Sequence, residues 1–170
     1  MSNYDWSKFD IYIYMESTPE ILFDKWATSA GLESFFMKKV KYESANGESR
    51  AGDEHVRKDD KYTWEFVHGS VLNGVVVDVI LNKQVSFSFG ESIIDVKFIK
   101  SNNRTLVHLI QRNIPTDEES KVDTHLNCRG AWIHFLTVLK SVIEFNVDCR
   151  DKESSTGGSL ATGFVPQEYS

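Results

Sequence analysis

Residues 127–150, NCRGAWIHFLTVLKSVIEFNVDCR, are the longest segment with the pattern of one regular element, and they constrain the fold most. Apolar side chains recur along the segment at helical spacing and cover most of its circumference. Lys140, Glu144 and Asp148 interrupt it, which excludes a membrane span. Because this broad apolar surface must be buried in a water-soluble fold, the rest of the chain is expected to wrap around the helix.

The preceding segments have the alternating pattern of strands. In residues 8–16 the apolar side chains fall on one face, and the same period of two recurs in 62–67, 75–81, 84–90, 92–100 and 104–112. Residues 17–36 predict two short helices, with Thr18 as the N-cap and Pro19 in the first turn. Residues 37–61 are polar and are expected to form a loop with a hairpin turn at an Asn-Gly pair.

This order of elements predicts an α+β fold. A curved antiparallel sheet of about six to seven strands would wrap around the long C-terminal helix, with two short helices after the first strand. Residues 1–150 are expected to form this single domain. Residues 151–170 are rich in Gly, Ser and Thr and are expected to form a flexible tail.

Composition excludes several classes of function. The formal net charge of −6 argues against binding of nucleic acid, which depends on clusters of Lys and Arg. The longest apolar runs are too short for membrane insertion, and the N-terminus lacks the pattern of a signal peptide. Cys128 and Cys149 would be too far apart on one helix for a disulfide, which favours a reduced, cytoplasmic chain.

Four segments, in order, resemble a known superfamily. They are STPEILFDKWATSAGLESFF, YTWEFVHGSVLNGVVVDVILNKQVSFSF, TLVHLIQ, and Trp132 followed by FLTVLKSVIE. Together they are similar to the START-like (SRPBCC, helix-grip) superfamily, and within it to the family named after the activator of the heat-shock protein 90 ATPase. Two departures concern the helix ends: Ala131 separates Gly130 from Trp132, and Phe145 and Asn146 stand where related sequences often have glycines. The helix is therefore expected to extend as far as residue 150.

The resemblance implies a cavity between sheet and helix, since members of the superfamily commonly bind lipids, sterols or aromatic molecules there. Such cavities are mostly apolar. The side chains expected to line it are Trp64, Phe66, Phe87, Phe89, Val96, Phe98, Leu109, Gln111, Trp132, Leu136 and Leu139. They could equally be simple core residues.

Three functions compete. The first is a soluble carrier or sensor of a small apolar ligand. The second is a chaperone-associated interaction module, for which the acidic residues 117–119 and the tail segment GFVPQEY are candidate surfaces; the chain has no room for the co-chaperone's second domain. The third is a cyclase-like or aromatase-like enzyme, which needs ionisable groups inside the cavity.

Candidates for chemistry are few. Gln111 is expected to be a polar handle at one end of the cavity, and no catalytic residues, cofactor or metal are predicted. His125 and Cys128 are spaced i, i+3 and could share a helix face, but zinc needs three or four ligands. The alternative is that His125 lies near the start of the helix and that Cys128 is a small buried hydrophobic residue. The sequence favours binding over catalysis.

Gly130 is unusual inside a helix, because glycine costs about 1 kcal/mol relative to alanine. Either another backbone segment approaches it closely, or the helix begins nearby and Gly130 lies in a mobile first turn. The second alternative makes residues 117–130 a candidate lid over the mouth of the cavity.

Overall fold

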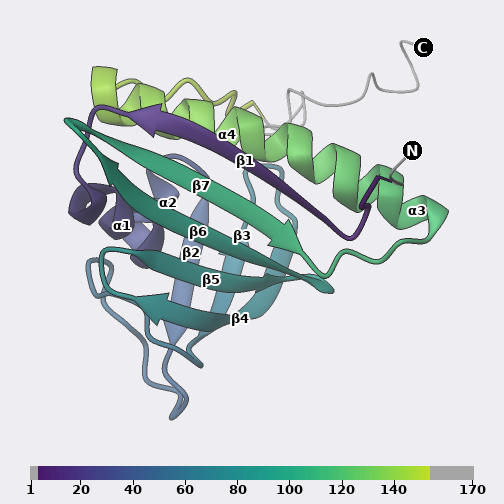
Figure 1. The fold of residues 1–170 in the computed structure, drawn as a ribbon. Helices are drawn as coiled ribbons and strands as arrows, with labels where there is room; N and C mark the ends of the chain where they lie inside the picture. The colour runs from purple at the N-terminus through teal and green to yellow at the C-terminus, as the bar shows by residue number, and fades with distance from the viewer. Residues whose placement is uncertain (1–3, 154–170) are drawn as a thin grey trace.

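The computed structural model describes residues 4–153. Strand β1 (Lys8–Met15) is followed by helices α1 (Pro19–Ala27) and α2 (Ser29–Glu33), and then by β2 (Lys39–Glu43), β3 (Lys61–Glu65), β4 (Val71–Ile80), β5 (Gln84–Phe89), β6 (Ser92–Ser101) and β7 (Arg104–Arg112). The chain ends in the short helix α3 (Glu118–Ser120), the π-helical turn η1 (Lys121–Leu126) and the long helix α4 (Asn127–Phe145). These elements confirm the predicted helix-grip fold (Figure 1).

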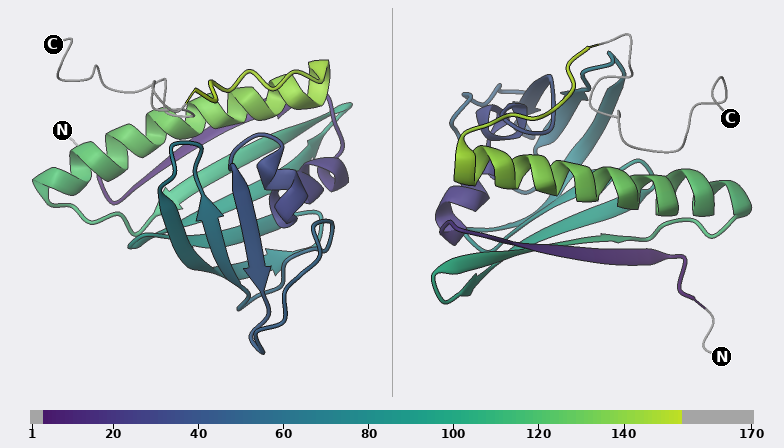
Figure 2. Two further views of the ribbon diagram at one scale, coloured as in Figure 1. Left: turned by 180° about the vertical axis from the view of Figure 1, so that it is seen from behind. Right: turned by 90° about the horizontal axis from the view of Figure 1, so that it is seen from above.

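The seven strands form one antiparallel sheet in the order β1-β7-β6-β5-β4-β3-β2. The first two strands therefore lie at opposite edges, and α1 and α2 carry the chain between them. From β2 onward the sheet is a meander that returns to pair β7 with β1. Figure 2 shows α4 along the β1 edge, with the sheet curving away beneath it.

Alternation explains which face of each strand is buried. On β1, Phe9, Ile11 and Met15 are buried, and Tyr12 points to solvent. The register then places Phe9 opposite Gln111 and Ile11 opposite Leu109, so that one concave apolar face continues across the sheet.

The two short helices meet at a tight corner. The Thr28 hydroxyl donates to the Asp24 carbonyl at 2.7 Å and accepts from the Gly31 N–H at 3.0 Å, so one residue ends α1 and begins α2. A Cβ on Gly31 would lie 2.4 Å from the Asp24 carbonyl oxygen. Glycine is therefore required for this close approach.

Hydrogen bonds join the C-terminal end of α4 to β1. The Lys140 ammonium donates to the Tyr14 carbonyl at 2.7 Å, and the Glu144 carboxylate accepts from the Glu16 N–H at 2.8 Å. After the helix, the buried Arg150 guanidinium donates to the Met37 carbonyl at 3.1 Å. The segment after α4 is therefore held against the loop that precedes β2.

Four expectations about local structure need correction. The polar region 37–61 contains strand β2, because Val40 and Tyr42 alternate with lysines at the sheet edge. The expected acidic loop is helical from Glu118 onward, with Asp117 as its N-cap. Helix α4 ends at Phe145 rather than at residue 150, because Asn146 adopts a left-handed conformation with φ of 55°.

The fourth correction concerns Gly130. No atom lies within 4 Å of a Cβ built on this residue, so a close backbone approach does not explain the glycine. Gly130 lies in the first turn of α4, directly after η1. A lid movement of residues 117–130 remains a prediction. The tail boundary at residue 150 also remains a prediction, since residues 154–170 and the segment GFVPQEY lie outside the described residues.

Candidate functional site

The space between sheet and helix is largely filled by aromatic side chains around Phe36. Its ring centroid lies 4.5 Å from that of Phe135, 4.8 Å from that of Trp132 and 5.7 Å from that of Trp64. Phe36 is buried, and it follows α2, so the two short helices insert it under α4. The centre of the grip is therefore packed core.

A cavity remains between the sheet and the helix, at the end where α4 begins. Its volume is about 210 Å³, and it lies between α4, the β3–β4 hairpin and the end of β5. Five aromatic side chains form its wall: Phe36, Phe66, Phe89, Trp132 and Phe135. The rest of the lining is His68, Ser70, Asn127, Cys128 and Ala131.

The structure divides the predicted cavity residues into two groups. Phe66, Phe89 and Trp132 line this cavity. The other eight are buried in the core and do not line it: Trp64, Phe87, Val96, Phe98, Leu109, Gln111, Leu136 and Leu139. A role for any of the eleven in ligand binding remains a prediction.

Seven lining residues were missed by the sequence reasoning. Cys128 and Phe135 could have been found, because they lie four residues before and three residues after Trp132 and share its face. Ala131 lies at the same helical spacing from Cys128 and Phe135. His68 and Ser70 lie in a hairpin turn, and Asn127 lies at the helix start. For Phe36 no local pattern distinguishes it from its neighbour Phe35.

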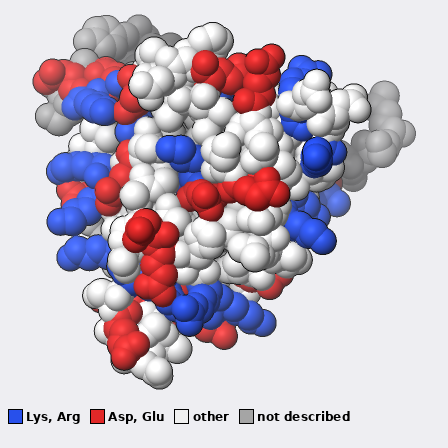
Figure 3. All heavy atoms as spheres, turned by 90° about the vertical axis from the view of Figure 1, so that its left-hand side faces the viewer, with Lys and Arg blue, Asp and Glu red and all other residues white. Residues whose placement is uncertain are grey.

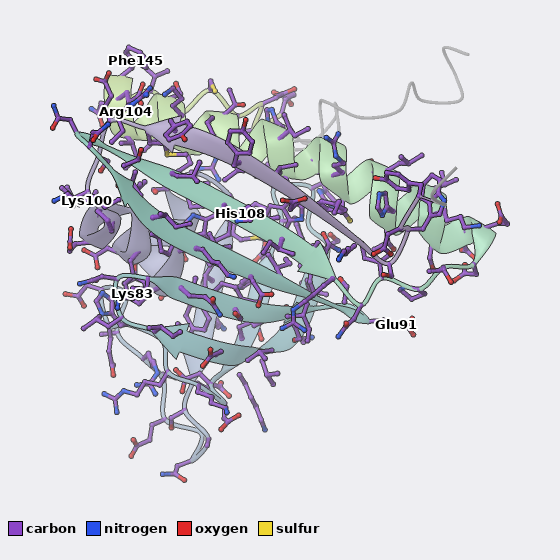
Figure 4. The ribbon with its side chains drawn as sticks, in the orientation of Figure 1. Lys83, Glu91, Lys100, Arg104, His108 and Phe145 are labelled. Atoms are coloured by element: carbon purple, nitrogen blue, oxygen red, sulfur yellow. The ribbon has the colours of Figure 1, made fainter. Side chains whose placement is uncertain are left out.

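The cavity opens toward a wider surface depression of about 460 Å³. The two share Phe66, Ser70, Phe89 and Cys128, and the depression continues to Glu91, Ser120 and Thr124. Figure 4 shows Glu91 at the end of the sheet that faces the connection to α3. The mouth of the cavity is therefore bordered by α3 and η1, the segment predicted to act as a lid.

Gln111 fixes the position of Trp132 in the cavity wall. The Trp132 indole N–H donates to the Gln111 Oε1 at 2.9 Å, and the Gln111 Nε2 donates to the Ser92 hydroxyl at 2.8 Å. The Ser92 hydroxyl in turn donates to the Phe89 carbonyl at 2.7 Å. Both polar groups of Gln111 are therefore hydrogen-bonded inside the protein, and Gln111 positions an aromatic side chain of the cavity wall.

His125 attaches η1 to the N-terminal segment. Its side chain is fully buried, with Nδ1 3.0 Å from the Trp6 carbonyl and Nε2 2.8 Å from the Tyr4 hydroxyl. Because a carbonyl only accepts hydrogen bonds, Nδ1 carries the proton and donates it. The side chain thus has a buried structural role just before the start of α4.

The described residues 4–153 contain no cluster of three His, Cys, Asp or Glu side chains arranged to hold a metal ion. Cys128 lines the cavity, and burial raises the pKa of its thiol to about 11, so the thiolate is scarce at neutral pH. Cavity-lining residues include no carboxylate, lysine or arginine. The site offers aromatic contact and neutral hydrogen bonds.

No helix within residues 4–153 has both the length and the apolar character needed to cross a bilayer.

Figure 3 shows acidic and basic side chains interspersed over the end of the molecule that carries α1. This face therefore presents no large field of one sign.

Comparisons with solved structures show the same fold. A protein of Staphylococcus saprophyticus, SSP2350, matches with a TM-score of 0.65 and 19% identity, over 82% of this chain and 95% of its own. The Aha1 dimer of Colwellia psychrerythraea matches with a TM-score of 0.61 and 19% identity, over 81% and 96%. DynU16, a putative protein from the dynemicin biosynthetic locus, matches with a TM-score of 0.64 and 8% identity, over 84% and 49%.

None of the curated proteins matches the sequence. The family model described as "Activator of Hsp90 ATPase homolog 1-like protein" matches residues 16–144, which include both short helices, strands β2 to β7 and almost all of α4. The chain therefore belongs to the activator of Hsp90 ATPase homolog 1-like family, within the START-like, helix-grip superfamily.

Proposed function

We propose that the protein binds a small apolar molecule in the cavity at the start of α4. The observation that carries this proposal is the wall of five aromatic rings around about 210 Å³, with uncharged polar groups on one side. Mostly apolar pockets with a few placed polar groups are typical of small-molecule sites. The two cysteines are free, which supports a reducing compartment such as the cytoplasm for this activity.

The first test is native mass spectrometry of freshly purified protein, before and after extraction with organic solvent. A retained molecule that extraction removes supports the proposal and gives its mass. The extracted protein is then titrated with 6-propionyl-2-(dimethylamino)naphthalene, a two-ring dye whose emission shifts to shorter wavelength in an apolar site. Absence of both a retained molecule and probe binding would refute the proposal.

A pair of variants on α4 localises the binding. Ala131 lines the cavity, whereas Ile133 is exposed on the same helix. Ala131→Phe is expected to fill the cavity and abolish probe binding, and Ile133→Phe is expected to leave it unchanged. Equal binding by both variants would place the probe elsewhere.

We propose association with an Hsp90-type chaperone as a second function, which the name of the family supports. The predicted acidic surface, Asp117 with Glu118 and Glu119 of α3, lies beside the mouth of the cavity. Isothermal titration of Hsp90 with this chain, and with a Glu118→Lys/Glu119→Lys variant, tests the proposal. Heat of binding that the variant loses supports it, and no heat with the wild-type chain refutes it.

A further inference from the structure

The size of the cavity limits the molecule it can hold. About 210 Å³ lies below the usual range for drug-sized ligands of about 300–1,000 Å³. A molecule of one or two fused rings fits this space. A sterol or a long acyl chain would have to extend into the outer depression of about 460 Å³, which Glu91 borders.

The wall of the cavity favours a planar aromatic molecule. Phe36 lies between Trp132 and Phe135, and Phe89 has its ring centroid 5.5 Å from that of Trp132. These rings meet at tilted or edge-on angles, and such packing presents both ring faces and ring edges. A flat ring can therefore make favourable aromatic contacts on several sides.

One side of the cavity carries a hydrogen-bonding pair. The Ser70 hydroxyl lies 2.7 Å from the His68 Nε2, and the His68 ring stacks on Phe66 with centroids 5.5 Å apart. The hairpin is closed by the Gly69 N–H, which donates to the Phe66 carbonyl at 2.9 Å, and Gly69 has φ of 93°. The turn thus holds both polar side chains at the rim of the aromatic wall.

This pair can either accept or donate a hydrogen bond. If the Ser70 hydroxyl donates to His68, the serine oxygen is left to accept from a ligand hydroxyl. If His68 instead carries its proton on Nε2, the serine hydroxyl is left to donate to a ligand carbonyl. Both ligand groups are neutral.

The electrostatics of the site disfavour an anion. The residues that line the cavity carry no Lys or Arg, and the outer depression contributes a carboxylate, that of Glu91. An ionised group without a partner is costly to remove from water. Fatty acids and phosphorylated molecules are therefore poor candidates.

From these observations we infer that the ligand is a neutral aromatic molecule of one or two rings that carries a hydroxyl or carbonyl group bound by Ser70 and His68. This inference rests on the proposed function and specifies its ligand class. The rings occupy the aromatic wall, and the polar group lies at the hairpin, facing the mouth.

Three matched probes test the inference by isothermal titration at pH 7: 2-naphthol, naphthalene and 2-naphthoate. 2-Naphthol is expected to bind at least about 3- to 10-fold more tightly than naphthalene, the range given by one net hydrogen bond. 2-Naphthoate is expected to bind more weakly than both.

Ser70→Ala is expected to weaken binding of 2-naphthol about 3- to 10-fold and to leave binding of naphthalene unchanged. Ser101→Ala, in the β6–β7 turn outside the cavity, is the control and should change neither affinity. The affinity of the Ser70→Ala variant for naphthalene separates loss of the hydrogen bond, which leaves this affinity unchanged, from general damage to the cavity, which lowers it.

The outcomes distinguish this inference from the proposed function. If no molecule is retained and neither the dye nor any of the three probes binds, the proposed function itself is refuted. If only the three probes fail to bind, the inference alone is overturned. If naphthalene binds and Ala131→Phe blocks it, but the hydroxyl gives no advantage or Ser70→Ala has no selective effect, only the inference is overturned. Tighter binding of 2-naphthoate than of 2-naphthol would also overturn it.

Discussion

Gln111→Met is expected to destabilise the protein, because Gln111 joins three elements inside the core. It lies on β7, is fully buried, accepts from the Trp132 indole N–H on α4 and donates to the Ser92 hydroxyl on β6. Methionine has a similar length and can make neither bond. The variant therefore leaves a buried indole N–H without its acceptor, while the Ser92 hydroxyl keeps its bond to the Phe89 carbonyl.

The magnitude follows from these contacts. A buried donor left without a partner costs about 1–3 kcal/mol, and the lost bond to Ser92 adds about 0.5–1.5 kcal/mol. Burial of the apolar methionine chain offsets part of the loss. The free energy of unfolding should therefore fall by about 1–4 kcal/mol, a large share of the roughly 5–15 kcal/mol typical of a domain.

A double-mutant cycle with Trp132→Phe isolates the hydrogen bond. Urea unfolding followed by far-UV circular dichroism gives the free energy of each variant. Because Trp132→Phe removes the donor, Gln111→Met should cost about 1–2 kcal/mol less in that background. Gln84→Met, on the part-exposed side of β5, is the control and should change stability by less than about 0.5 kcal/mol.

Two results would refute this reasoning. Additive effects of the two substitutions, within about 0.5 kcal/mol, would show that Gln111 and Trp132 do not depend on each other. A Gln111→Met variant as stable as the wild type would show that the buried bonds contribute nothing net.

Three further predictions concern the thiols, acid stability and the segment after α4. At pH 8 iodoacetamide should modify exposed Cys149 well before Cys128, because burial raises the pKa of the Cys128 thiol to about 11. Mass spectrometry of the digested protein measures both rates of modification, and equal rates would contradict the prediction. Burial lowers the pKa of His134, so the unfolded chain takes up a proton that the folded chain does not. The free energy of unfolding should therefore fall as the pH drops below about 6.5. A His134→Gln variant whose free energy of unfolding fell equally steeply with pH would exclude this cause. Arg150→Met should lower the free energy of unfolding by roughly 2–4 kcal/mol, because a buried guanidinium is lost from backbone carbonyl and carboxylate acceptors. Lys152→Met, at an exposed ion pair, is the control and should lower it by less than about 1 kcal/mol in the same urea assay.

Much of the fold was predictable because its main signals are periodic. Alternation places Phe9, Ile11 and Met15 on one face of β1, and helical spacing places Trp132 and Leu136 on one face of α4. These patterns depend only on local geometry, which the chain imposes wherever it forms a strand or a helix. Six of the seven strands and the gripped helix follow from them.

The ends of the helices and strands were less predictable, because each end depends on whether a single residue continues the element or stops it. Asn146 ends α4 by adopting a left-handed conformation, although apolar residues continue beyond it. β2 pairs with β3 through a short pattern of two apolar residues among lysines, which resembles a solvated loop until its partner is present. Such sites are decided by contacts that lie far away in the sequence.

The location of the cavity could not be predicted from periodicity at all. Inward-facing residues on every strand have the same pattern whether they pack against another side chain or border an empty space. Phe36 decides between these outcomes here, because it follows α2 and fills the centre of the grip against Trp64, Trp132 and Phe135. The open volume is therefore displaced to the end where Gly69 turns the β3–β4 hairpin, and aromatic walls meet polar side chains there. In this chain the position of the proposed ligand site is set by Phe36, the residue that closes the middle of the fold.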